Sequence, residues 1–399
     1  MKQSWEIKAI GDVCKVIAGQ SPEGKYYNDN GNGLPFYQGK KEYGEKYIGE
    51  PTTWTTKVTK EAEANDILMS VRAPVGPINF ATQKICIGRG LAAIRATKLI
   101  DKEFLFNFLL KHESEIVGNA GAVFNSINKA QIEAIKIPLP PLPEQQRIVA
   151  ILDKTFAALD KAKANAEQNL KNAKELFESY LQNIFETKGE GWEEKTLEQV
   201  SKTFGRGKSK HRPRNFSGLY GGDYPFIQTG NIRNCNHYIT EYTQTYNEVG
   251  LAQSKLWPVG TICITIAANI AETGVLTFDA CFPDSVIGIV VNEKFADRDF
   301  VEYLLQSFKV RIVALGKGAA QANINMGTFE NELFPFPSIE TQQIIVHQLD
   351  ALSLETNKLE AIYQQKIADL EELKKSVLQK AFNGEFTSAS SVLKKEVIL

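Results

Sequence analysis

Two stretches of this chain, residues 144–187 and 340–383, carry apolar residues at alternating steps of four and three and contain no proline or glycine. A narrow apolar stripe of this period, kept over several heptads, is typical of helices that pair as a coiled coil. At about 1.5 Å per residue, each helix would be roughly 66 Å long, and this length favours pairing over two helices of a compact bundle. The predicted stripe includes Ile148, Leu152, Leu159, Leu176, Leu349, Leu352, Leu359 and Leu373.

The other two parts of the chain, residues 5–137 and 192–335, have a different texture. They hold most of the glycines, nearly all the aromatic residues and short runs typical of strands. An apolar stretch with helical spacing follows in each part, over residues 104–117 and 300–315. Each part then ends in a proline cluster, which ends one element and suits the first turn of the next helix. The pattern predicts a mixed α/β fold of the α+β class, with two similar globular domains separated by two long helices.

The order of these parts is an internal repeat, because motifs return in the same order about 190 residues later. The recurring pairs are Trp5 and Trp192, residues 34–38 and 224–228, residues 141–153 and 338–350, and residues 181–185 and 378–382. The predicted division is a first domain at 1–143, a long helix at 144–190, a second domain at 191–337, a second long helix at 338–384 and a tail at 385–399.

Charge and cysteine content narrow the class of protein. The 399 residues include 46 Lys plus Arg against 47 Asp plus Glu, a formal net charge of −1 at pH 7. This balance excludes a polycation that coats nucleic acid by bulk charge but leaves a local basic patch open. The five cysteines form no CxxC pair, and the chain has neither an apolar signal segment at its start nor an apolar run long enough to span a bilayer. We therefore expect a soluble cytoplasmic protein.

Each partial match to a catalytic motif in the sequence lacks a residue that the chemistry requires. Residues 19–26 imitate a phosphate-binding loop, but Tyr26 stands where Ser or Thr must hold Mg²⁺. A nuclease of the PD…(D/E)xK kind would need a carboxylate at Asn292, and no Asn-Pro-Pro-aromatic run of an adenine methyltransferase exists. The four histidines are scattered without paired ligands. The sequence predicts no catalytic residue and no metal site.

The repeat and several motifs together resemble the specificity subunits of type I restriction–modification systems, over essentially the full length. The motifs are the Pro-Leu-Pro-Pro-Leu-Pro-Glu-Gln-Gln-Arg-Ile run at 138–148, the run at 124–135 before it, and the stretch at 205–231; the second copy has the shorter form Pro-Ser-Ile-Glu-Thr-Gln-Gln at 337–343. The resemblance implies two target-recognition domains that each read half of a split site in double-stranded DNA. It also implies that the two helices pair antiparallel and dock two methyltransferase subunits, which bring in the motor-nuclease subunits. S-adenosylmethionine, ATP and Mg²⁺ would then belong to the other subunits, and this chain would hold no cofactor.

With this family in view, basic and amide side chains in both domains become candidates for DNA contact. Arg and Lys contact phosphates, whereas bidentate Arg, Asn and Gln read base edges. The second domain has a basic stretch at 202–214 that contains no acidic residue. Its candidates are Arg206, Lys208, Lys210, Arg212, Arg214, Gln228, Thr229 and Asn231, and those of the first domain are Lys40, Lys41, Arg72 and Arg89. The alternatives are a solvated basic loop for 202–214 and an ordinary tight turn for Arg89.

Three other functions compete with this interpretation. A fused methyltransferase or nuclease is disfavoured by the missing motifs. A coiled-coil scaffold without a DNA role is disfavoured by the basic, glycine-rich loop. A DNA-recognition subunit for a different effector agrees with the sequence equally well. If the chain reads DNA, its two dissimilar domains predict an asymmetric site, and the helix length would set the unread spacer.

Overall fold

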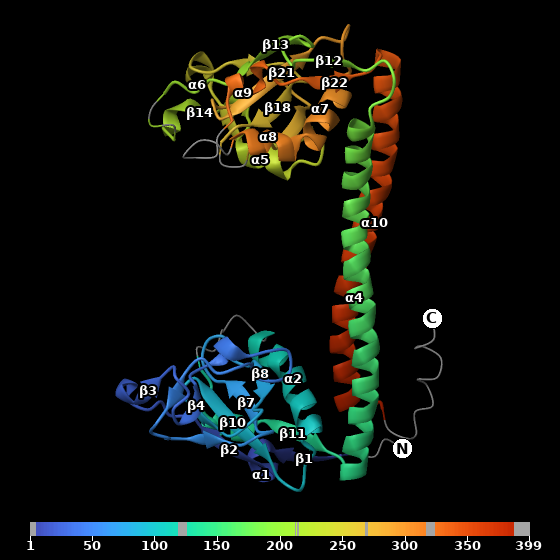
Figure 1. Cartoon of the computed structure of the whole chain (residues 1–399). Coiled ribbons are helices and arrows are strands. Elements are labelled where there is room, and N and C mark those ends of the chain that lie inside the picture. The colour runs from blue at the N-terminus through green and yellow to red at the C-terminus, as the bar shows by residue number, and fades with distance from the viewer. Residues whose placement is uncertain are drawn as a thin grey trace. The chain divides into compact units, whose positions relative to one another are not determined.

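A computed structural model describes residues 5–118, 126–211, 213, 215–267, 270–316 and 324–386, with the backbone alone for 114–118, 314–316 and 330 (Figure 1). The chain divides into two compact units. Unit 1 comprises Met1–Glu167 and Gln365–Leu399, and unit 2 comprises Gln168–Gln364. Each unit therefore contains one globular domain and one end of each long helix. None of the described helices has the length and hydrophobicity that a membrane crossing requires.

Unit 1 contains two sheets, of strand order β2-β10-β7-β8 and β3-β5-β4-β9-β6, and a strand pair β1-β11. The strands are β1 Glu6–Ala9, β2 Cys14–Ala18, β3 Tyr27–Asn28, β4 Leu34–Tyr37, β5 Trp54–Thr55, β6 Glu61–Ala62, β7 Ile67–Ser70, β8 Ile78–Phe80, β9 Ile85–Ile87, β10 Leu91–Ala96 and β11 Lys136–Leu139. The helices are α1 Ile10–Val13, η1 Gly24–Tyr26, η2 Lys40–Glu42, α2 Lys102–Gly118 and α3 Lys129–Ala134. Residues of α2, including Phe104 and Leu105, pack with Ile67 and Ile94 of the first sheet in one buried cluster.

Unit 2 repeats this plan with sheets of order β13-β21-β18-β19-β15 and β16-β14-β20-β17 and the pair β12-β22. The strands are β12 Glu193–Lys195, β13 Ser201–Arg206, β14 Tyr220–Phe226, β15 Tyr238–Ile239, β16 Gln244–Tyr246, β17 Leu256–Trp257, β18 Ile262–Thr265, β19 Thr273–Leu276, β20 Ala280–Cys281, β21 Val286–Val291 and β22 Phe334–Phe336. The helices are η3 Ser217–Leu219, α5 Thr229–Asn234, α6 Glu248–Ala252, α7 Arg298–Ser307, α8 Lys309–Gly316 and α9 Met326–Glu330. Two copies of one α/β plan confirm the predicted fold class.

A buried glutamine explains why the Gln-Gln motif recurs in both copies. The Gln145 Oε1 accepts a hydrogen bond from the Asp101 amide at 2.7 Å, and its Nε2 donates to the Pro140 carbonyl at 2.8 Å. In unit 2, Gln342 makes the equivalent bonds to the Asp297 amide and the Pro337 carbonyl, both at 2.8 Å. A buried backbone group without a partner is costly, so this side chain is required wherever the proline segment meets the domain.

The long helices are α4 (Leu142–Thr187) and α10 (Ile339–Phe382), and their contacts in each unit run antiparallel. In unit 1, Lys163 pairs with Glu371 at 2.7 Å and Lys374 pairs with Asp160 at 2.8 Å. In unit 2, Lys174 pairs with Glu360 at 3.8 Å, and the Tyr180 hydroxyl donates to Gln348 Oε1 at 3.4 Å. Partner numbers on α10 fall as those on α4 rise, which confirms the antiparallel pairing.

The seam between these helices departs from the predicted register. Leu176, Leu359 and Leu373 are 51%, 38% and 47% exposed and lie outside it. Residues that are buried or half-buried in their place are Phe177 and Leu181 on α4 and Ile367 on α10. A straight helix with 3.6 residues per turn drifts by about 20° per heptad, so an added step of four keeps the stripe facing its partner.

The other predicted stripe positions lie inward. Ile148, Leu152, Leu159 and Leu349 are buried, and Leu352 is half-buried. Ile148 and Leu152 belong to the buried cluster of unit 1, and Leu349 belongs to that of unit 2. The helix ends therefore complete the cores of the domains as well as contacting one another.

Candidate nucleic-acid interface

The predicted basic stretch begins on β13 and leaves the sheet after Arg206. Arg206, Lys208 and Lys210 are exposed. The Arg206 guanidinium donates from Nε and Nη2 to the Asp284 carbonyl at 2.8 and 2.5 Å. Arg212 and Arg214 lie outside the described residues. DNA contact by these side chains stays a prediction, and the structure shows that three of them are accessible for it.

The backbone of this stretch is fixed from both sides. Gln253 Oε1 accepts hydrogen bonds from the Lys210 and His211 amides at 2.7 and 3.1 Å. The Ser254 hydroxyl donates to the Lys208 carbonyl at 2.9 Å. At Gly207, a Cβ would lie 2.3 Å from the Phe282 carbonyl oxygen, so only glycine fits there. The lysines thus extend from an ordered segment, which lowers the entropy lost when they bind a ligand.

A cleft of about 560 Å³ opens beside this segment in unit 2. Stacked aromatic rings form part of its lining, with the Phe226 and Tyr246 centroids 4.1 Å apart. The polar lining residues are Ser209, Asn215, Ser217, Gln228, Thr229, Gln244 and Ser285. Hydrogen-bonding groups beside aromatic rings can contact both the edge and the face of a base or sugar.

The three predicted residues after β14 have different roles. Gln228 and Thr229 line the cleft, and the Gln228 Nε2 donates to Gln244 Oε1 at 2.6 Å. Asn231 does not belong to the lining; its Oδ1 accepts from the Gln228 amide at 2.9 Å and caps α5. The cap accounts for Asn231 without any ligand, whereas the amide pair of Gln228 and Gln244 faces open space.

Unit 1 has a cleft of the same size, also about 560 Å³. It is lined by Ser21, Pro22, Tyr27, Phe36, Gln38, Glu42, Thr53 and Arg89. The Tyr27 and Phe36 rings stack at 4.8 Å, and the Ser21 hydroxyl donates to Gln38 Oε1 at 2.9 Å. Of the four residues predicted in this domain, Arg89 is the one that lines the cleft.

The remaining predicted residues of the first domain lie elsewhere. Lys40 and Lys41 are exposed on η2, directly after the Gln38 turn. Arg72 is exposed between β7 and β8 and forms an isolated bridge with Ser126. The structure therefore does not bring Arg72 to the cleft lining, and DNA contact by these three residues stays a prediction.

Strand pairing shows that the two clefts are equivalent positions of the repeat. Phe36 faces Cys86 in the parallel pair β4-β9, and Phe226 faces Cys281 in the parallel pair β14-β20. The corresponding lining residues are Ser21 and Ser209, Tyr27 and Tyr220, Phe36 and Phe226, Gln38 and Gln228, and Thr53 and Gln244. The serine, the glutamine and the aromatic floor are common to both clefts, whereas other lining residues differ.

Several lining residues were not found from the sequence, among them Ser21, Thr53 and Gln244. One signal was available, because the recurrence of residues 34–38 as 224–228 places Gln38 opposite Gln228. The others come from loops and short strands that have no recognisable motif. Only the strand register brings them to one cleft.

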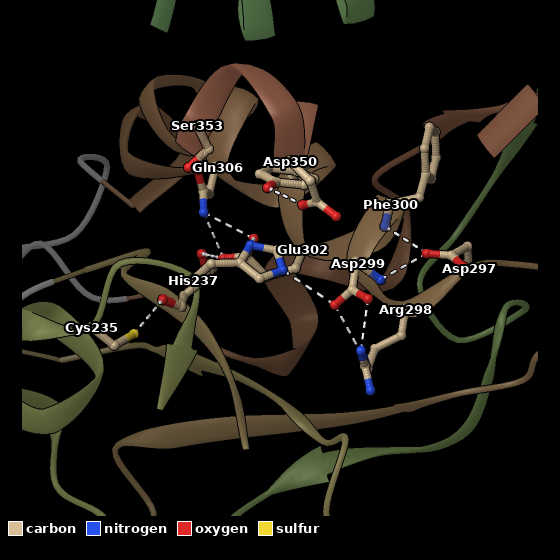
Figure 2. Close-up of polar contacts among 12 residues, drawn as sticks. Cys235, His237, Asp297, Arg298, Asp299, Phe300, Glu302, Gln306, Asp350 and Ser353 are labelled. Carbon is tan, nitrogen blue, oxygen red and sulfur yellow. Dashed lines mark hydrogen bonds and ion pairs between the residues drawn. The ribbon is translucent and has the colours of Figure 1, made fainter. Parts of the chain in front are cut away.

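A second polar cluster in unit 2 surrounds His237 (Figure 2). Its Nδ1 lies 2.6 Å from Glu302 Oε2, and its Nε2 lies 3.2 Å from Asp299 Oδ1. Burial opposes the charged imidazole, but the two carboxylates outweigh it and raise the pKa of His237 to about 9. Burial likewise opposes the charge of Asp299, yet His237 and Arg298 lower the pKa of Asp299 to about 2. Within the described ranges, no group of His, Cys, Asp or Glu side chains is arranged to hold a metal ion.

Comparison with known proteins identifies the family. A model of the type I restriction modification DNA specificity domain matches residues 2–171 and again residues 189–371. This chain belongs to that family. The two matched segments correspond to the two copies of the repeat, so each copy is one DNA specificity domain.

Individual relatives agree with this assignment. The putative type I restriction enzyme MjaX specificity subunit of Methanocaldococcus jannaschii is 44% identical over 184 residues, which cover 45% of this chain and 43% of that relative. This alignment therefore spans less than half of the relative's length. The type I restriction enzyme EcoBI specificity subunit of Escherichia coli is 25% identical over 423 residues, covering 96% of this chain and 87% of that relative.

Two solved structures share the fold. The HsdS subunit from Thermoanaerobacter tengcongensis matches with a TM-score of 0.61 at 18% identity, covering 96% of this chain and 98% of that one. A chain from a structural study of complex assembly and conformational transition in the type I R-M system matches with a TM-score of 0.80 at 20% identity, covering 95% and 98%. At these identities the likeness establishes the fold.

Proposed function

We propose that this chain is the DNA-recognition subunit of a type I restriction–modification system and reads a split, asymmetric target in double-stranded DNA. One observation carries the proposal: the two DNA specificity domains have equivalent clefts, with a common serine, glutamine and aromatic floor but a different set of neighbours. A common frame explains why both domains bind the same kind of ligand. Different neighbours explain why the two half-sites would differ.

The proposal includes partners that supply catalysis. Two methyltransferase subunits would dock on the α4–α10 pair, and motor-nuclease subunits would join through them. S-adenosylmethionine, ATP and Mg²⁺ would be held by those subunits, and this chain would act in the cytoplasm without a cofactor. The support is the family membership and the exposure of apolar side chains on the helix surface outside the seam, such as Leu176 and Leu373.

Methylation mapping tests the function. Genomic DNA would be sequenced for N6-methyladenine from cells that carry the neighbouring methyltransferase with this chain, and from matched cells without it. The expected result is a split, asymmetric motif that appears only when this chain is present. An unchanged methylation pattern, despite a folded chain and an active methyltransferase, would contradict the proposal and favour a scaffold or a different effector.

The proposal assigns the unread spacer to the helix pair. Inserting one heptad into the exposed middle of both α4 and α10 adds about 10 Å of helix, or about 3 base pairs of B-DNA. We expect the spacer of the methylation motif to lengthen, or binding to be lost, while both half-sites stay unchanged. A motif with its original spacer would show that the helices do not set the distance.

A further inference from the structure

Each unit places one arginine at the same turn of the fold but supplies it from a different segment of the chain. The turn after β9 in unit 1 corresponds to the turn after β20 in unit 2, because the strand pairs β4-β9 and β14-β20 have the same register. Counting from Cys86 and Cys281 puts Arg89 opposite Asp284. The segments that follow β2 and β13 also correspond. The Gly19 amide donates to the Leu91 carbonyl, and the Gly207 amide donates to the Val286 carbonyl, both at 2.9 Å.

In unit 1 the arginine belongs to the turn itself. Arg89 is exposed, lines the cleft, and its amide donates to the Ser21 hydroxyl at 3.1 Å. The flanking Gly88 and Gly90 have no room for a side chain, since a Cβ would lie 2.7 Å and 2.4 Å from atoms of Gln38. The turn is therefore packed against the cleft glutamine, and Arg89 is held next to that side chain.

In unit 2 the turn carries Asp284, and the arginine comes from the neighbouring strand. Arg206 stands where unit 1 has Ala18. Its side chain crosses to the turn and donates twice to the Asp284 carbonyl, at 2.8 and 2.5 Å. The residues on either side of Asp284, Pro283 and Ser285, line the cleft of unit 2. Arg206 is not itself a lining residue, but its guanidinium is bound at the turn that corresponds to Arg89, between two residues that line the cleft.

The Arg206 guanidinium keeps donors that could bind the edge of a base. The bonds to Asp284 use one side of the Arg206 guanidinium, and among the described residues its Nη1 makes no hydrogen bond. An arginine fork donates two parallel bonds to O6 and N7 of guanine, and a glutamine amide pairs with N6 and N7 of adenine. Gln38 and Gln228 stand at the corresponding place in the two clefts. The cleft of unit 1 therefore combines a guanidinium with an amide, and in unit 2 the guanidinium is bound to the turn whose flanking residues line the cleft.

We propose that Arg89 and Arg206 are the corresponding base-reading arginines of the two domains, and that each reads one guanine in its own half-site. The inference rests on the proposed DNA-recognition function and adds to it a residue and a base for each half. It also describes how the two domains differ: the arginine belongs to the turn in unit 1 and to the neighbouring strand in unit 2, while both guanidinium groups are placed at the same turn of the fold.

Methylation mapping of single variants tests the inference in the intact chain with its methyltransferase. Arg89→Ala should reduce discrimination at one guanine of one half-site by about 10- to 100-fold and leave the other half-site unchanged. Arg206→Ala should do the same at one guanine of the other half-site. Lys98→Ala, which removes an exposed charge outside the cleft lining, is the matched control and should leave both half-sites specific.

Conservative variants separate base reading from other roles. Arg89→Lys and Arg206→Lys keep the charge but lose the fork, so the relaxed specificity should persist if the arginines read bases. A motif that is unchanged in the lysine variants, with methylation lowered evenly over all sites in the alanine variants, would indicate phosphate contact and overturn the inference. Arg206→Ala also removes the bonds to Asp284, so the unfolding temperatures of the variant and the parent chain would be compared. If the alanine variant does not fold, the result for Arg206→Lys tests the inference. If the unaltered chain directs no methylation motif at all, the proposed function itself is refuted.

Discussion

The two units fill corresponding positions around one cation with different chemistry. The Phe80 amide donates to the Lys46 carbonyl in unit 1, and the Val275 amide donates to the His237 carbonyl in unit 2, both at 2.9 Å. Lys46 then pairs with Glu103 on α2 at 2.9 Å. In unit 2 the partners on α7 are Asp299 and a second, fully buried carboxylate, Glu302.

The residue that corresponds to Glu302 in unit 1 is Phe106. Its ring stacks on Phe80 with the centroids 4.5 Å apart. In unit 2 the Glu302 carboxylate instead accepts from Thr273 at 2.8 Å and from Gln306 at 2.8 Å. One unit therefore has an aromatic contact where the other has a buried charged network.

The hydrogen bonds that both units share indicate which contacts define the fold. Asp101 caps α2 through the amide of Phe104 at 3.0 Å, and Asp297 caps α7 through the amide of Phe300 at 3.1 Å. Gln145 and Gln342 make equivalent bonds to the backbone. Side chains that satisfy backbone groups are kept, because those groups are present in either copy, whereas side chains that satisfy one another can be replaced together.

The largest expected effect comes from breaking the charged network. Glu302→Ala leaves the His237 imidazolium buried with one carboxylate and should lower the free energy of unfolding of unit 2 by about 3–5 kcal/mol. Phe106→Ala should cost unit 1 a similar amount, about 3–5 kcal/mol, through lost packing. Hydrogen exchange of peptides from α7 and α2 would report each unit separately. A loss below about 1 kcal/mol for Glu302→Ala would show that the network does not hold unit 2 together.

A second comparison uses equivalent leucines on the two long helices. Leu181 and Leu378 are both buried, and Leu181→Ala and Leu378→Ala should each cost about 2–5 kcal/mol. The matched controls, Leu176→Ala and Leu373→Ala, remove exposed side chains and should change stability by less than about 0.5 kcal/mol. Thermal unfolding monitored by circular dichroism would decide. A large loss of stability in the two control variants would show that Leu176 and Leu373 lie in the seam, as the heptad pattern predicted.

The smallest of the three effects is a difference in pH dependence. His237 has a pKa of about 9 in the folded chain, above its ordinary value of 6.5, so its stabilising charge is fully present below pH 6.5 and is lost as pH rises through 9. Unit 2 should lose up to about 3 kcal/mol over this range. The pKa of Lys46 is raised above its ordinary 10.5, because its contacts with Glu103 outweigh burial, so its pair stays charged and unit 1 should be unaffected. His237→Gln should abolish the slope in unit 2, and an equal slope in both units would contradict this assignment.

Much of the architecture was accessible from the sequence. The repeat predicted two copies of one domain, and the period of the apolar residues predicted two long paired helices. The exposure of Leu176 and Leu373 was not accessible, because a strict heptad cannot show where a straight helix adds a step of four. The role of Gln145 was also hidden, since the motif records that it recurs but not which backbone groups it satisfies.

The candidate site was predicted only in part. Arg89, Gln228 and Thr229, which were selected because arginine and amide side chains suit DNA, line the two clefts, whereas DNA contact by Arg206 and Lys208 stays a prediction. Gln244 and Thr53 were missed because they reach the cleft through strand register, which a single sequence does not reveal. Asn231 was selected for its amide, yet that amide caps a helix.

The central claim is that the two domains are one reading module with different side chains. A chimaera in which a second copy of residues 5–137 replaces residues 192–335 tests it most directly, through the methylation motif that it directs with its methyltransferase. We expect a symmetric motif: the half-site of the first domain, repeated in inverted orientation, with the spacer of the parent chain. A folded, active chimaera that still methylates the original asymmetric motif would contradict it.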